Sequence, residues 1–384
     1  MRFEFVTAGR IIFGPGTSAE AAPSAREMGG KALVVTGRTP ERVAFLLSDL
    51  EKQGVPFLTF PVTGEPAIST VMAGLKEANN AEADLVIGIG GGSVIDAGKV
   101  IAALLTNGGE PLDYLEVIGK GEKLHRPPAP YIAIPTTSGT GAEVTRNGVL
   151  TVPEDRIKVS MRSPLMLPRL ALVDPRLTLS LPPELTASTG MDALTQLLEA
   201  YLSLESNPLT DGICREGLKR AASSLRRAYQ DGSDETAREN MSLASLFGGL
   251  ALANARLGAV HGFAGTLGGM YSAAHGLICA RLLPEVMEIN YRALQNRQPS
   301  SPALGRYDEI GRILTGRAEG RGGDGIVWIQ NLCRNLKIPD LSRIGLNEND
   351  FPAVVEKSKS SSSMRGNPLT LSDEELTEIL RRSI

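Results

Sequence analysis

One segment constrains the fold of this chain more than any other: residues 84–99, which read Asp-Leu-Val-Ile-Gly-Ile-Gly-Gly-Gly-Ser-Val-Ile-Asp-Ala-Gly-Lys. An apolar run rich in isoleucine and valine ends in three glycines and a serine, and a helical pattern follows at once. This order predicts a buried strand that enters a helix through a close turn. Free N–H groups at a helix N-terminus attract anions, so residues 90–92 and Ser93 suit a phosphate. A tight turn without a ligand is the alternative, because glycine runs alone are weak signals.

The composition is that of an ordinary soluble globular protein. At 384 residues, with 42% apolar and 22% charged residues, the chain is long enough for two or three domain-sized units. A net charge of −3 argues against a general nucleic-acid binder, which usually carries a basic face. No stretch approaches the ~20 uncharged apolar residues that span a bilayer, and the N-terminus lacks the apolar core of a signal peptide. We therefore expect a cytoplasmic protein that binds neither nucleic acid nor a membrane.

The cysteines support this expectation. Cys214, Cys279 and Cys333 are odd in number and widely spaced, which fits neither a disulfide framework nor a zinc knuckle. Reduced thiols are the norm in the cytoplasm, so we predict that all three are reduced and buried.

The N-terminal half alternates short β-branched runs with amphipathic segments, as a parallel α/β sheet requires. The predicted strands cover residues 31–36, 56–60, 85–89, 131–135 and 170–173. The predicted helices between them cover residues 40–53, 69–81 and 93–105. A hairpin is predicted from two further short strands, residues 149–151 and 157–160, which a Pro-Glu-Asp-Arg segment separates.

The sequence of the C-terminal half shows helical patterns instead of strand patterns. Pro182 and Pro183 open a long helix rich in alanine and leucine, since proline suits the first turn of a helix. Further helical patterns cover residues 208–227, 235–256, 259–272, 276–292, 322–336 and 372–382, and the serine-rich stretch 357–363 is a predicted loop. The fold class that we predict is an α/β N-terminal nucleotide-binding domain with a parallel, Rossmann-like sheet over residues 1–177. An all-α C-terminal domain follows over residues 178–384.

Two further segments of the N-terminal half resemble parts of a nucleotide site. Residues 134–145, Ile-Pro-Thr-Thr-Ser-Gly-Thr-Gly-Ala-Glu-Val-Thr, present hydroxyls that suit phosphates, ribose or a carboxamide, although plain solvated loops have the same composition. Two such loops at the carboxyl ends of strands favour a nucleotide. Gly37 and Arg38 stand where NAD sites often place an acid for the ribose 2′-hydroxyl. An arginine there accommodates a 2′-phosphate, which favours NADP(H) over NAD(H), with an ordinary exposed arginine as the alternative.

The C-terminal half concentrates histidine. His261 and His275 are 14 residues apart, which is ~21 Å along an unbroken helix and too far to share a metal ion. Two adjacent glycines, residues 268–269, invite a helix break that would fold His275 back towards His261. Upstream, Asp192 and Gln196 lie one helical turn apart on one face. Asp192 with the two histidines would suit Fe(II) or Zn(II), and a chance arrangement is the alternative.

Four motifs occur in order along the chain: Gly90-Gly-Gly-Ser-x-x-Asp96-x-x-Lys99, Pro135-Thr-Thr-Ser-Gly-Thr-Gly-Ala-Glu-Val-Thr145, Thr189-Gly-Met-Asp-Ala-Leu-Thr195, and His261 followed by His275-Gly276. With these motifs the chain resembles the iron-containing (group III) alcohol dehydrogenases, a family that includes maleylacetate reductases and is related to glycerol dehydrogenases. The likeness covers essentially the whole chain, from Gly14-Pro-Gly16 to Asn367-Pro368.

The resemblance implies an NAD(P)-dependent oxidoreductase that transfers hydride between nicotinamide and a small alcohol, aldehyde or ketone, in a cleft between the two domains. It also implies a homo-oligomer, since relatives commonly form dimers. The predicted cofactor-binding residues are Gly37, Arg38, Gly91, Gly92, Ser93, Asp96, Thr136, Thr137, Ser138, Thr140, Thr145 and Lys158. The metal ligands of the family would fall on Asp192, Gln196, His261 and His275, and the predicted catalytic residues are His261, His275 and Asp96.

The chain departs from the family pattern at two positions near the implied active site. Metal-dependent members have histidine where this chain has Gln196, and many have another histidine where it has Gly265. An amide oxygen binds metal weakly compared with imidazole, although three strong ligands would remain for an Fe(II) or Zn(II) site with an open position. Without a metal ion, His261 or His275 would have to supply the hydrogen bond and the proton.

These departures leave alternatives. One is a metal-independent reductase of the maleylacetate-reductase type, and another is a cofactor-binding protein whose catalysis is impaired. A dehydroquinate-synthase-like enzyme would share the architecture, but the motif order follows the dehydrogenases.

Overall fold

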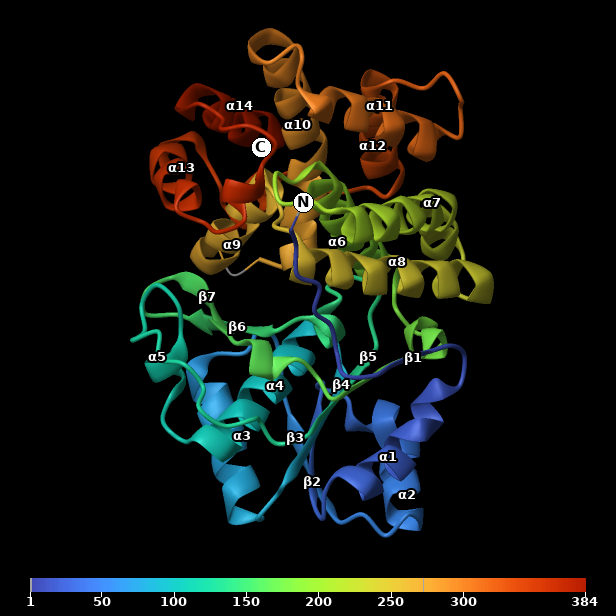
Figure 1. The fold of residues 1–384 in the computed structure, drawn as a ribbon, viewed down its shortest axis with the longest axis vertical. Helices are drawn as coiled ribbons and strands as arrows, with labels where there is room; N and C mark the ends of the chain where they lie inside the picture. Colours follow the sequence, from blue (N-terminus) through green and yellow to red (C-terminus); the bar gives the residue numbers. More distant parts are fainter. Residues whose placement is uncertain (1, 272) are drawn as a thin grey trace. The chain divides into compact units, whose positions relative to one another are not determined.

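The apolar runs of the N-terminal half form a six-stranded sheet in which every strand is parallel to its neighbours (Figure 1). The structure is a computed structural model that describes residues 2–271 and 273–384. Two units make up the chain: Thr7–Leu179, and Ser180–Ile384 together with the segment up to Val6. The strands of the sheet, in spatial order, are β1 (Ile11–Phe13), β8 (Leu170–Val173), β5 (Tyr131–Pro135), β4 (Leu85–Gly90), β2 (Ala32–Thr36) and β3 (Phe57–Pro61).

Helices cover both faces of this sheet. They are α1 (Ala21–Met28), α2 (Ala44–Lys52), α3 (Ile68–Asn80), α4 (Gly92–Asn107) and the short α5 (Pro111–Tyr114). Because side chains alternate along a strand, Val34 and Ile87 pack with α1 and α2, whereas Leu33 and Val86 pack with α3 and α4. The predicted hairpin is confirmed as β6 (Asn147–Val152) and β7 (Ile157–Arg162), which pair antiparallel.

The carboxyl ends of β2, β4 and β5 meet at one edge of the sheet. Thr36 is in register with Ile89, and Gly90 is in register with Pro135. The chain order reverses here, since β3 lies beyond β2 on one side while β4 and β5 follow on the other. Open α/β sheets bind ligands at such a switch point, so the segments after these three strands are placed for a nucleotide.

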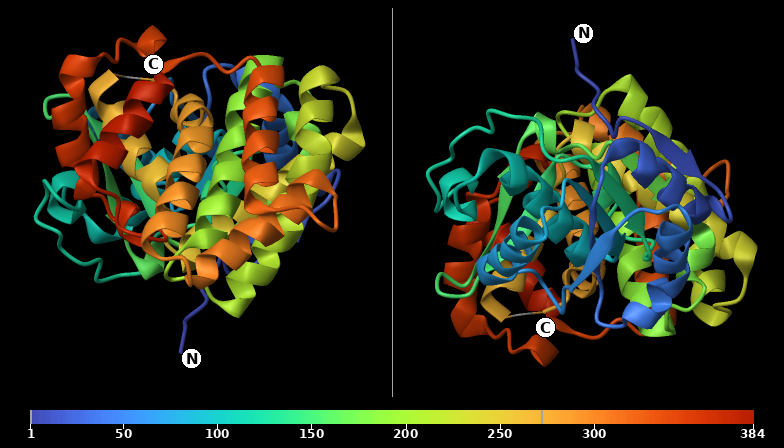
Figure 2. Two further views of the ribbon diagram at one scale, coloured as in Figure 1. Left: turned by 90° about the horizontal axis from the view of Figure 1, so that it is seen from above. Right: turned by 90° about the horizontal axis from the view of Figure 1, so that it is seen from below.

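The second unit is built from helices. They are α6 (Pro183–Leu202), α7 (Pro208–Gln230), α8 (Glu235–Asn254), α9 (Ala259–Tyr271), α10 (His275–Arg297), α11 (Pro302–Thr315), α12 (Gly322–Asn335), α13 (Phe351–Lys359) and α14 (Asp373–Ser383). Short 3-10 turns join several of these elements. Helix α6 packs against α7, α8 and α10 (Figure 2), and it is buried on nearly all sides, as an apolar central helix must be. The prolines mark its start correctly, because Pro183 is its first residue.

The segment before the sheet also belongs to this helical unit. The backbone N–H of Val6 donates to Oδ1 of Asn254 at 2.5 Å, and Nδ2 of Asn254 donates to the carbonyl oxygen of Val6 at 2.7 Å. Asn254 is the last residue of α8, so its amide joins the N-terminal segment to the end of that helix.

The structure corrects several expectations. The predicted break at Gly268 and Gly269 is wrong, because α9 continues through both glycines and α10 begins only at His275. The loop predicted over residues 357–363 is helical as far as Lys359, since α13 buries one face against the core. Strand β1 and helices α1, α11 and α13 were not predicted from the sequence. The three cysteines are free and buried, as predicted.

Within the described part of the chain, no single helix is both long and apolar enough to cross a membrane. Only α8 and α9 taken together reach that length and composition, and the chain bends by 96° between them.

Candidate active site

The glycine turn after β4 forms a helix N-terminus that no side chain of the described residues caps with a hydrogen bond. Gly91 is the N-cap of α4, and no side chain caps this helix. A Cβ at Gly92 would lie 2.7 Å from Cγ2 of Thr140, and one at Gly90 would lie 2.6 Å from Cγ2 of Val94, so both positions require glycine. The N-terminus of α4, whose first turn includes Ser93, therefore lacks a side-chain cap, and such a helix end binds phosphate. The residues present fit the pyrophosphate of a dinucleotide.

The loop after β5 starts beside this turn. The N–H of Thr136 donates to the carbonyl oxygen of Gly90 at 2.9 Å. A Cβ on Gly91 would lie 3.5 Å from the side chain of Thr137, which is ordinary contact distance. Ser138, the next residue, is buried. The structure thus brings predicted cofactor-binding residues from two separate segments to one edge of the sheet.

Asp96 and Lys99 lie deeper on α4 and hold the segment that follows the threonine loop. The ammonium group of Lys99 donates to Oγ1 of Thr145 at 2.9 Å and to the carbonyl oxygen of Asn147 at 2.5 Å. Oδ2 of Asp96 accepts the N–H of Val149 at 3.2 Å. Burial raises the pKa of Asp96 and lowers the pKa of Lys99, and the attraction between the two offsets both shifts in part. These contacts position the loop and the hairpin, while the catalytic role of Asp96 stays a prediction.

The remaining predicted cofactor residues lie on β7 and after β2. Gly37 and Arg38 directly follow β2; a Cβ at Gly37 would meet nothing within 4 Å, and Arg38 is exposed. Lys158, on β7, is largely buried, and its ammonium group lies 3.1 Å from Oε1 of Glu65. Their contacts with a cofactor stay predictions.

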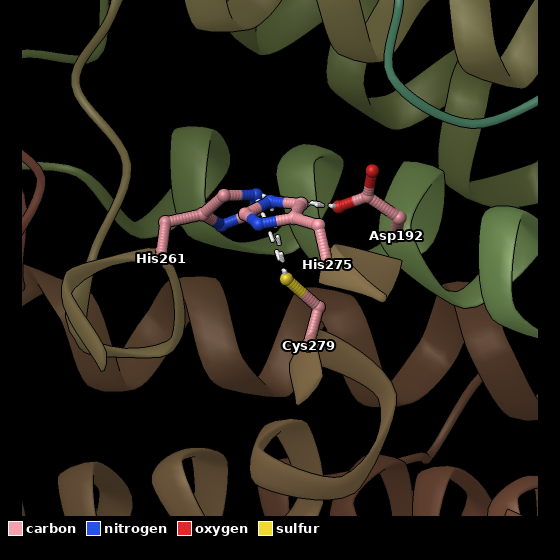
Figure 3. Close-up of side chains that lie close together, drawn as sticks. All are labelled: Asp192, His261, His275 and Cys279. Carbon is pink, nitrogen blue, oxygen red and sulfur yellow. Dashed lines mark hydrogen bonds and ion pairs between the residues drawn. The ribbon is translucent and has the colours of Figure 1, made fainter. Parts of the chain in front are cut away.

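In the helical unit, four side chains from three helices bring their polar atoms together (Figure 3). Asp192 lies on α6, His261 on α9, and His275 and Cys279 lie one turn apart on α10. One ligand atom from each residue lies within 4.8 Å of the other three. The side chains of Asp192 and His261 are only 3% and 8% exposed, whereas that of His275 is 32% exposed. Three of the predicted metal-site residues thus converge, and Cys279 joins them unpredicted.

A close helix crossing positions His275. A Cβ at Gly276 would lie 2.5 Å from the carbonyl oxygen of Ser188, so only glycine lets the start of α10 pass α6 at this distance. Ser188 lies one turn before Asp192 on α6. The crossing therefore places Nε2 of His275, at the first residue of α10, 3.8 Å from Oδ1 of Asp192.

Glu199 positions His261. Its carboxylate accepts the backbone N–H of Val260 at 2.7 Å, at the positive N-terminus of α9. The same carboxylate lies 2.7 Å from Nδ1 of His261, so we assign a proton to Nδ1, and Nε2 faces Asp192 at 3.4 Å. Metal-binding histidines are commonly supported by a carboxylate in this way. Glu199 was not predicted from the sequence, although it lies seven residues after Asp192 and hence on the same face of α6.

The side chains of this cluster shift one another's pKa values. Burial would raise the pKa of Asp192, but the neighbouring His261 and His275 more than offset this and hold it below its ordinary value. Burial likewise lowers the pKa of His261, and the adjacent Cys279, Asp192 and Glu199 outweigh it, so that the pKa is raised well above the usual range. The pKa of His275 is also raised, because Cys279 and Asp192 outweigh its burial. A divalent cation and these protons would compete for the same atoms.

The donor set fits a metal ion. Oδ1 of Asp192 is buried and accepts no hydrogen bond from the residues that the structure describes. It faces Nε2 of His261 and Nε2 of His275 at distances longer than an ordinary hydrogen bond. A buried carboxylate oxygen with this surrounding is suited to coordinate a cation.

Comparison with known proteins decides the family. The family model described as "Iron-containing alcohol dehydrogenase" matches residues 8–175, and the model "Fe-containing alcohol dehydrogenase family, C-terminal" matches residues 186–384. The chain belongs to the iron-containing alcohol dehydrogenase family. This membership confirms the predicted family resemblance and, with the parallel sheet and the helical unit, the predicted fold class.

Relatives cover the dehydrogenase over nearly its whole length. It is 36% identical to alcohol dehydrogenase 4 of Saccharomyces cerevisiae (strain YJM789) over 97% of this chain and 96% of that protein. It is 34% identical to 1,3-propanediol dehydrogenase of Klebsiella pneumoniae over 99% of this chain and 98% of that protein. The solved structure of an alcohol dehydrogenase from Oenococcus oeni superposes with a TM-score of 0.91 at 32% identity, covering all of both chains. The protein is therefore an alcohol dehydrogenase, an oxidoreductase of alcohols and aldehydes.

The two departures from the family pattern lie on different helices. Gln196 is buried on α6, and a Cβ at Gly248 of α8 would lie 2.8 Å from its Oε1, so the amide oxygen of Gln196 lies beside α8. On α9, a Cβ at Gly265 would meet nothing within 4 Å. The space for a side chain at Gly265 therefore exists, although this dehydrogenase leaves it unused.

Proposed function

We propose that this dehydrogenase prefers NADP(H) and moves a hydride between C4 of the nicotinamide and a small alcohol, aldehyde or ketone, with a metal ion held by Asp192, His261 and His275. The observation that carries the proposal is the convergence of these three side chains from three helices on a single point. A homodimer and a cytoplasmic location are parts of the same proposal, supported by the family resemblance and by composition alone.

The two units divide the chemistry. In the N-terminal unit, the uncapped N-terminus of α4 would bind the pyrophosphate, and the hydroxyls of Thr136 and Thr137 would contact the rest of the dinucleotide. A bound nicotinamide supplies the hydride chemistry, so the task of these residues is to bind and orient it. The fit of the glycine turn to a phosphate supports this assignment.

In the helical unit, the residues would hold and orient a Lewis acid. A bound divalent ion would polarise the substrate carbonyl and stabilise the negative charge that develops on its oxygen. Asp192, His261 and His275 would hold that ion, and Glu199 keeps the ring of His261 in the required orientation. Because the side chain of His275 is the most exposed of the three, we place the substrate on its side of the cluster.

One observation keeps a metal-independent reductase as the second candidate. His275 is accessible and has a raised pKa, so it could donate a hydrogen bond and a proton to a carbonyl without a metal ion. Turnover of an aldehyde after removal of bound metal by a chelator separates the two candidates. Loss of turnover that zinc or iron restores supports the metal-dependent mechanism, and undiminished turnover supports the metal-independent one.

The cofactor preference is tested at Arg38. We expect Arg38→Ala to lower kcat/KM for NADPH by about 10-fold to 100-fold, because a charge-assisted hydrogen bond to the 2′-phosphate contributes about 1.5–3 kcal/mol. The same change should leave kcat/KM for NADH nearly unaltered. The measurement is the ratio of the two kcat/KM values, taken with one aldehyde substrate.

Two further variants make this test specific. Arg42→Ala removes another exposed arginine nearby and should leave the ratio unchanged. Gly37→Asp, which no neighbour obstructs, should shift the preference towards NADH. An equal loss with both cofactors in Arg38→Ala would mean that the arginine does not distinguish them.

A further inference from the structure

Cys279 lies inside the cluster that the function uses, yet neither the sequence motifs nor the proposed mechanism assigns it a task. It is buried on α10, one turn after His275, so both side chains point to the same side of that helix. Figure 3 shows its sulfur directed at the two imidazole rings. Sγ lies 3.5 Å from Nε2 of His275 and 3.9 Å from Nε2 of His261.

The distances within the cluster match those between the ligands of one tetrahedral ion. Bond lengths of ~2.0 Å to nitrogen or oxygen and ~2.3 Å to sulfur place a nitrogen ~3.3 Å from an oxygen and ~3.5 Å from a sulfur. The two imidazoles lie 3.4 Å and 3.8 Å from Oδ1 of Asp192. The sulfur of Cys279 lies 3.5 Å and 3.9 Å from the same two imidazole nitrogens, close to the expected ~3.5 Å. Four of the separations between these ligand atoms are thus 3.4–3.9 Å, and all of them are at most 4.8 Å.

Hydrogen bonds account for the thiol of Cys279, which contacts both imidazoles, but they do not account for the carboxylate of Asp192. The nitrogen-to-oxygen distances of 3.4 Å and 3.8 Å exceed the usual range of such bonds, and Oδ1 of Asp192 accepts no hydrogen bond from the described residues. Buried polar atoms normally pair with one another. Oδ1 of Asp192 is the exception in this cluster, and a bound cation would satisfy it.

We propose that Cys279 is the fourth protein ligand of this cluster, and that the resulting Asp192, His261, His275 and Cys279 site selects zinc over iron. The inference rests on the proposed metal site and adds its fourth ligand and its selectivity. Sγ of Cys279 is among the four mutually close ligand atoms. The amide oxygen of Gln196 is buried and would lie 2.8 Å from a Cβ at Gly248 of α8.

The chemistry of sulfur sets the selectivity. A thiolate is a softer ligand than an amide oxygen, and one thiolate with two imidazoles and a carboxylate is a donor set typical of zinc. Exchanging an amide for a thiolate also adds a negative charge, which strengthens the hold on a divalent cation. Residue 196 can therefore lose its imidazole without loss of the metal site.

Cobalt is the first probe, because it reports sulfur ligation directly. The metal-free protein is loaded with Co(II), and a near-ultraviolet sulfur-to-cobalt charge-transfer band is expected in the parent chain. Cys279→Ser should abolish this band, whereas Cys333→Ser, which alters another buried free thiol, should keep it. Gln196→Ala should also keep it. A parent chain that binds cobalt without the band, or a band that persists in Cys279→Ser, would overturn the proposal.

Zinc affinity and thiol protection provide two further readouts. In competition with a chromophoric chelator, Cys279→Ser should weaken zinc binding by more than about 10-fold, because even residues that only support a ligand contribute that much. Gln196→Ala should change it by less than about threefold. Bound zinc should also protect Cys279 of the unaltered chain from alkylation, located by peptide mass spectrometry. This last measurement does not depend on any variant folding correctly.

The choice between zinc and iron is measured separately from metal binding itself. Protein loaded from equal zinc and iron(II) should hold mostly zinc, and Cys279→Ser should shift this ratio towards iron. Weaker zinc binding in Gln196→Ala than in Cys279→Ser would assign the fourth position to Gln196. If the parent chain binds no metal but still oxidises NADPH with an aldehyde, this inference fails while the dehydrogenase activity stands.

Discussion

Glu199 shows how much of the cluster depends on a residue that is not itself one of the four converging groups. Its carboxylate closes the N-terminus of α9 through the N–H of Val260 and lies against Nδ1 of His261. Gly258 makes this approach feasible, since a Cβ there would lie 2.8 Å from Oε1 of Glu199. A single carboxylate therefore sets both where α9 begins and which nitrogen of His261 faces Asp192.

We expect Glu199→Gln to lower zinc affinity by about 10-fold to 100-fold, because the amide cannot hold the imidazole as a carboxylate does. A chelator competition titration measures this loss. Glu309→Gln is the matched control: Glu309 contacts Tyr201 and Arg215, away from the cluster, so its loss should lower the unfolding temperature and leave zinc affinity unchanged. Equal zinc affinity in all three proteins would remove the positioning role of Glu199.

At this scale the sequence predicts part of the candidate site. Asp192, His261 and His275 could be chosen because their residue types and order match a family motif. Cys279 could have been found from its spacing of four after His275, and Glu199 from its spacing of seven after Asp192. Spacing along one helix does not show which side chains of other helices lie nearby. Neither Cys279 nor Glu199 was predicted for this reason.

At the scale of elements, the site depends on one close contact between two helices. The carbonyl oxygen of Ser188 on α6 occupies the space where any side chain at residue 276 would begin. The start of α10 is thereby held against α6, and His275 and Cys279 are carried with it. The geometry of the cluster is a property of this crossing as much as of its ligands.

We expect Gly276→Ala to destabilise the protein by about 1–3 kcal/mol, because its Cβ would meet backbone that cannot give way. Metal affinity should fall as well, since the shift moves His275. Gly305→Ala on α11 is the control, because its Cβ would meet nothing within 4 Å; it should stabilise the protein by about 0.5–1 kcal/mol. Unfolding curves and zinc titrations test both, and a neutral Gly276→Ala would argue against the crossing as the constraint.

The elements of the N-terminal sheet were predictable where the physical signal is local. β2, β4 and β5 are continuous apolar runs that end at glycine, threonine or proline, so their existence follows from sequence. Strand β1 was not predictable, because its three residues at the edge of the sheet are too few to show a periodicity. The break expected at Gly268 fails for a different reason: helix packing around the buried Gly268 keeps α9 regular, and tertiary contacts decide the matter.

At the scale of the whole molecule, each unit has its own hydrophobic core, and the N-terminal unit buries a carboxyl group, that of Glu143. In the N-terminal unit, burial raises the pKa of Glu143 to about 7, although its backbone hydrogen bond and Lys99 lower it in part. The unfolded chain ionises this carboxyl near 4.5. Between these two values the folded protein holds a proton that the unfolded chain releases, so Glu143 makes stability fall as pH rises.

We therefore expect Glu143→Gln to match the parent protein near pH 5 and to exceed it by up to about 3 kcal/mol at pH 8. Urea unfolding at the two pH values measures the difference. Glu154→Gln, which alters an exposed acid in the hairpin turn, should show no such dependence on pH. A constant difference between the parent and Glu143→Gln at both pH values would mean that the carboxyl is ionised in the folded state throughout.

The pairing of Val6 with Asn254 has a consequence for how the chain can be made and divided. During synthesis, the segment up to Val6 emerges before the whole α/β unit, yet its partner on α8 follows only 248 residues later. The helical unit therefore cannot finish folding as the ribosome delivers it in order; its opening segment must wait unpaired while the sheet forms. For the same reason, an excised fragment that starts at residue 180 would leave the amide of Asn254 without this partner, and a fusion that carries the N-terminal segment would restore it.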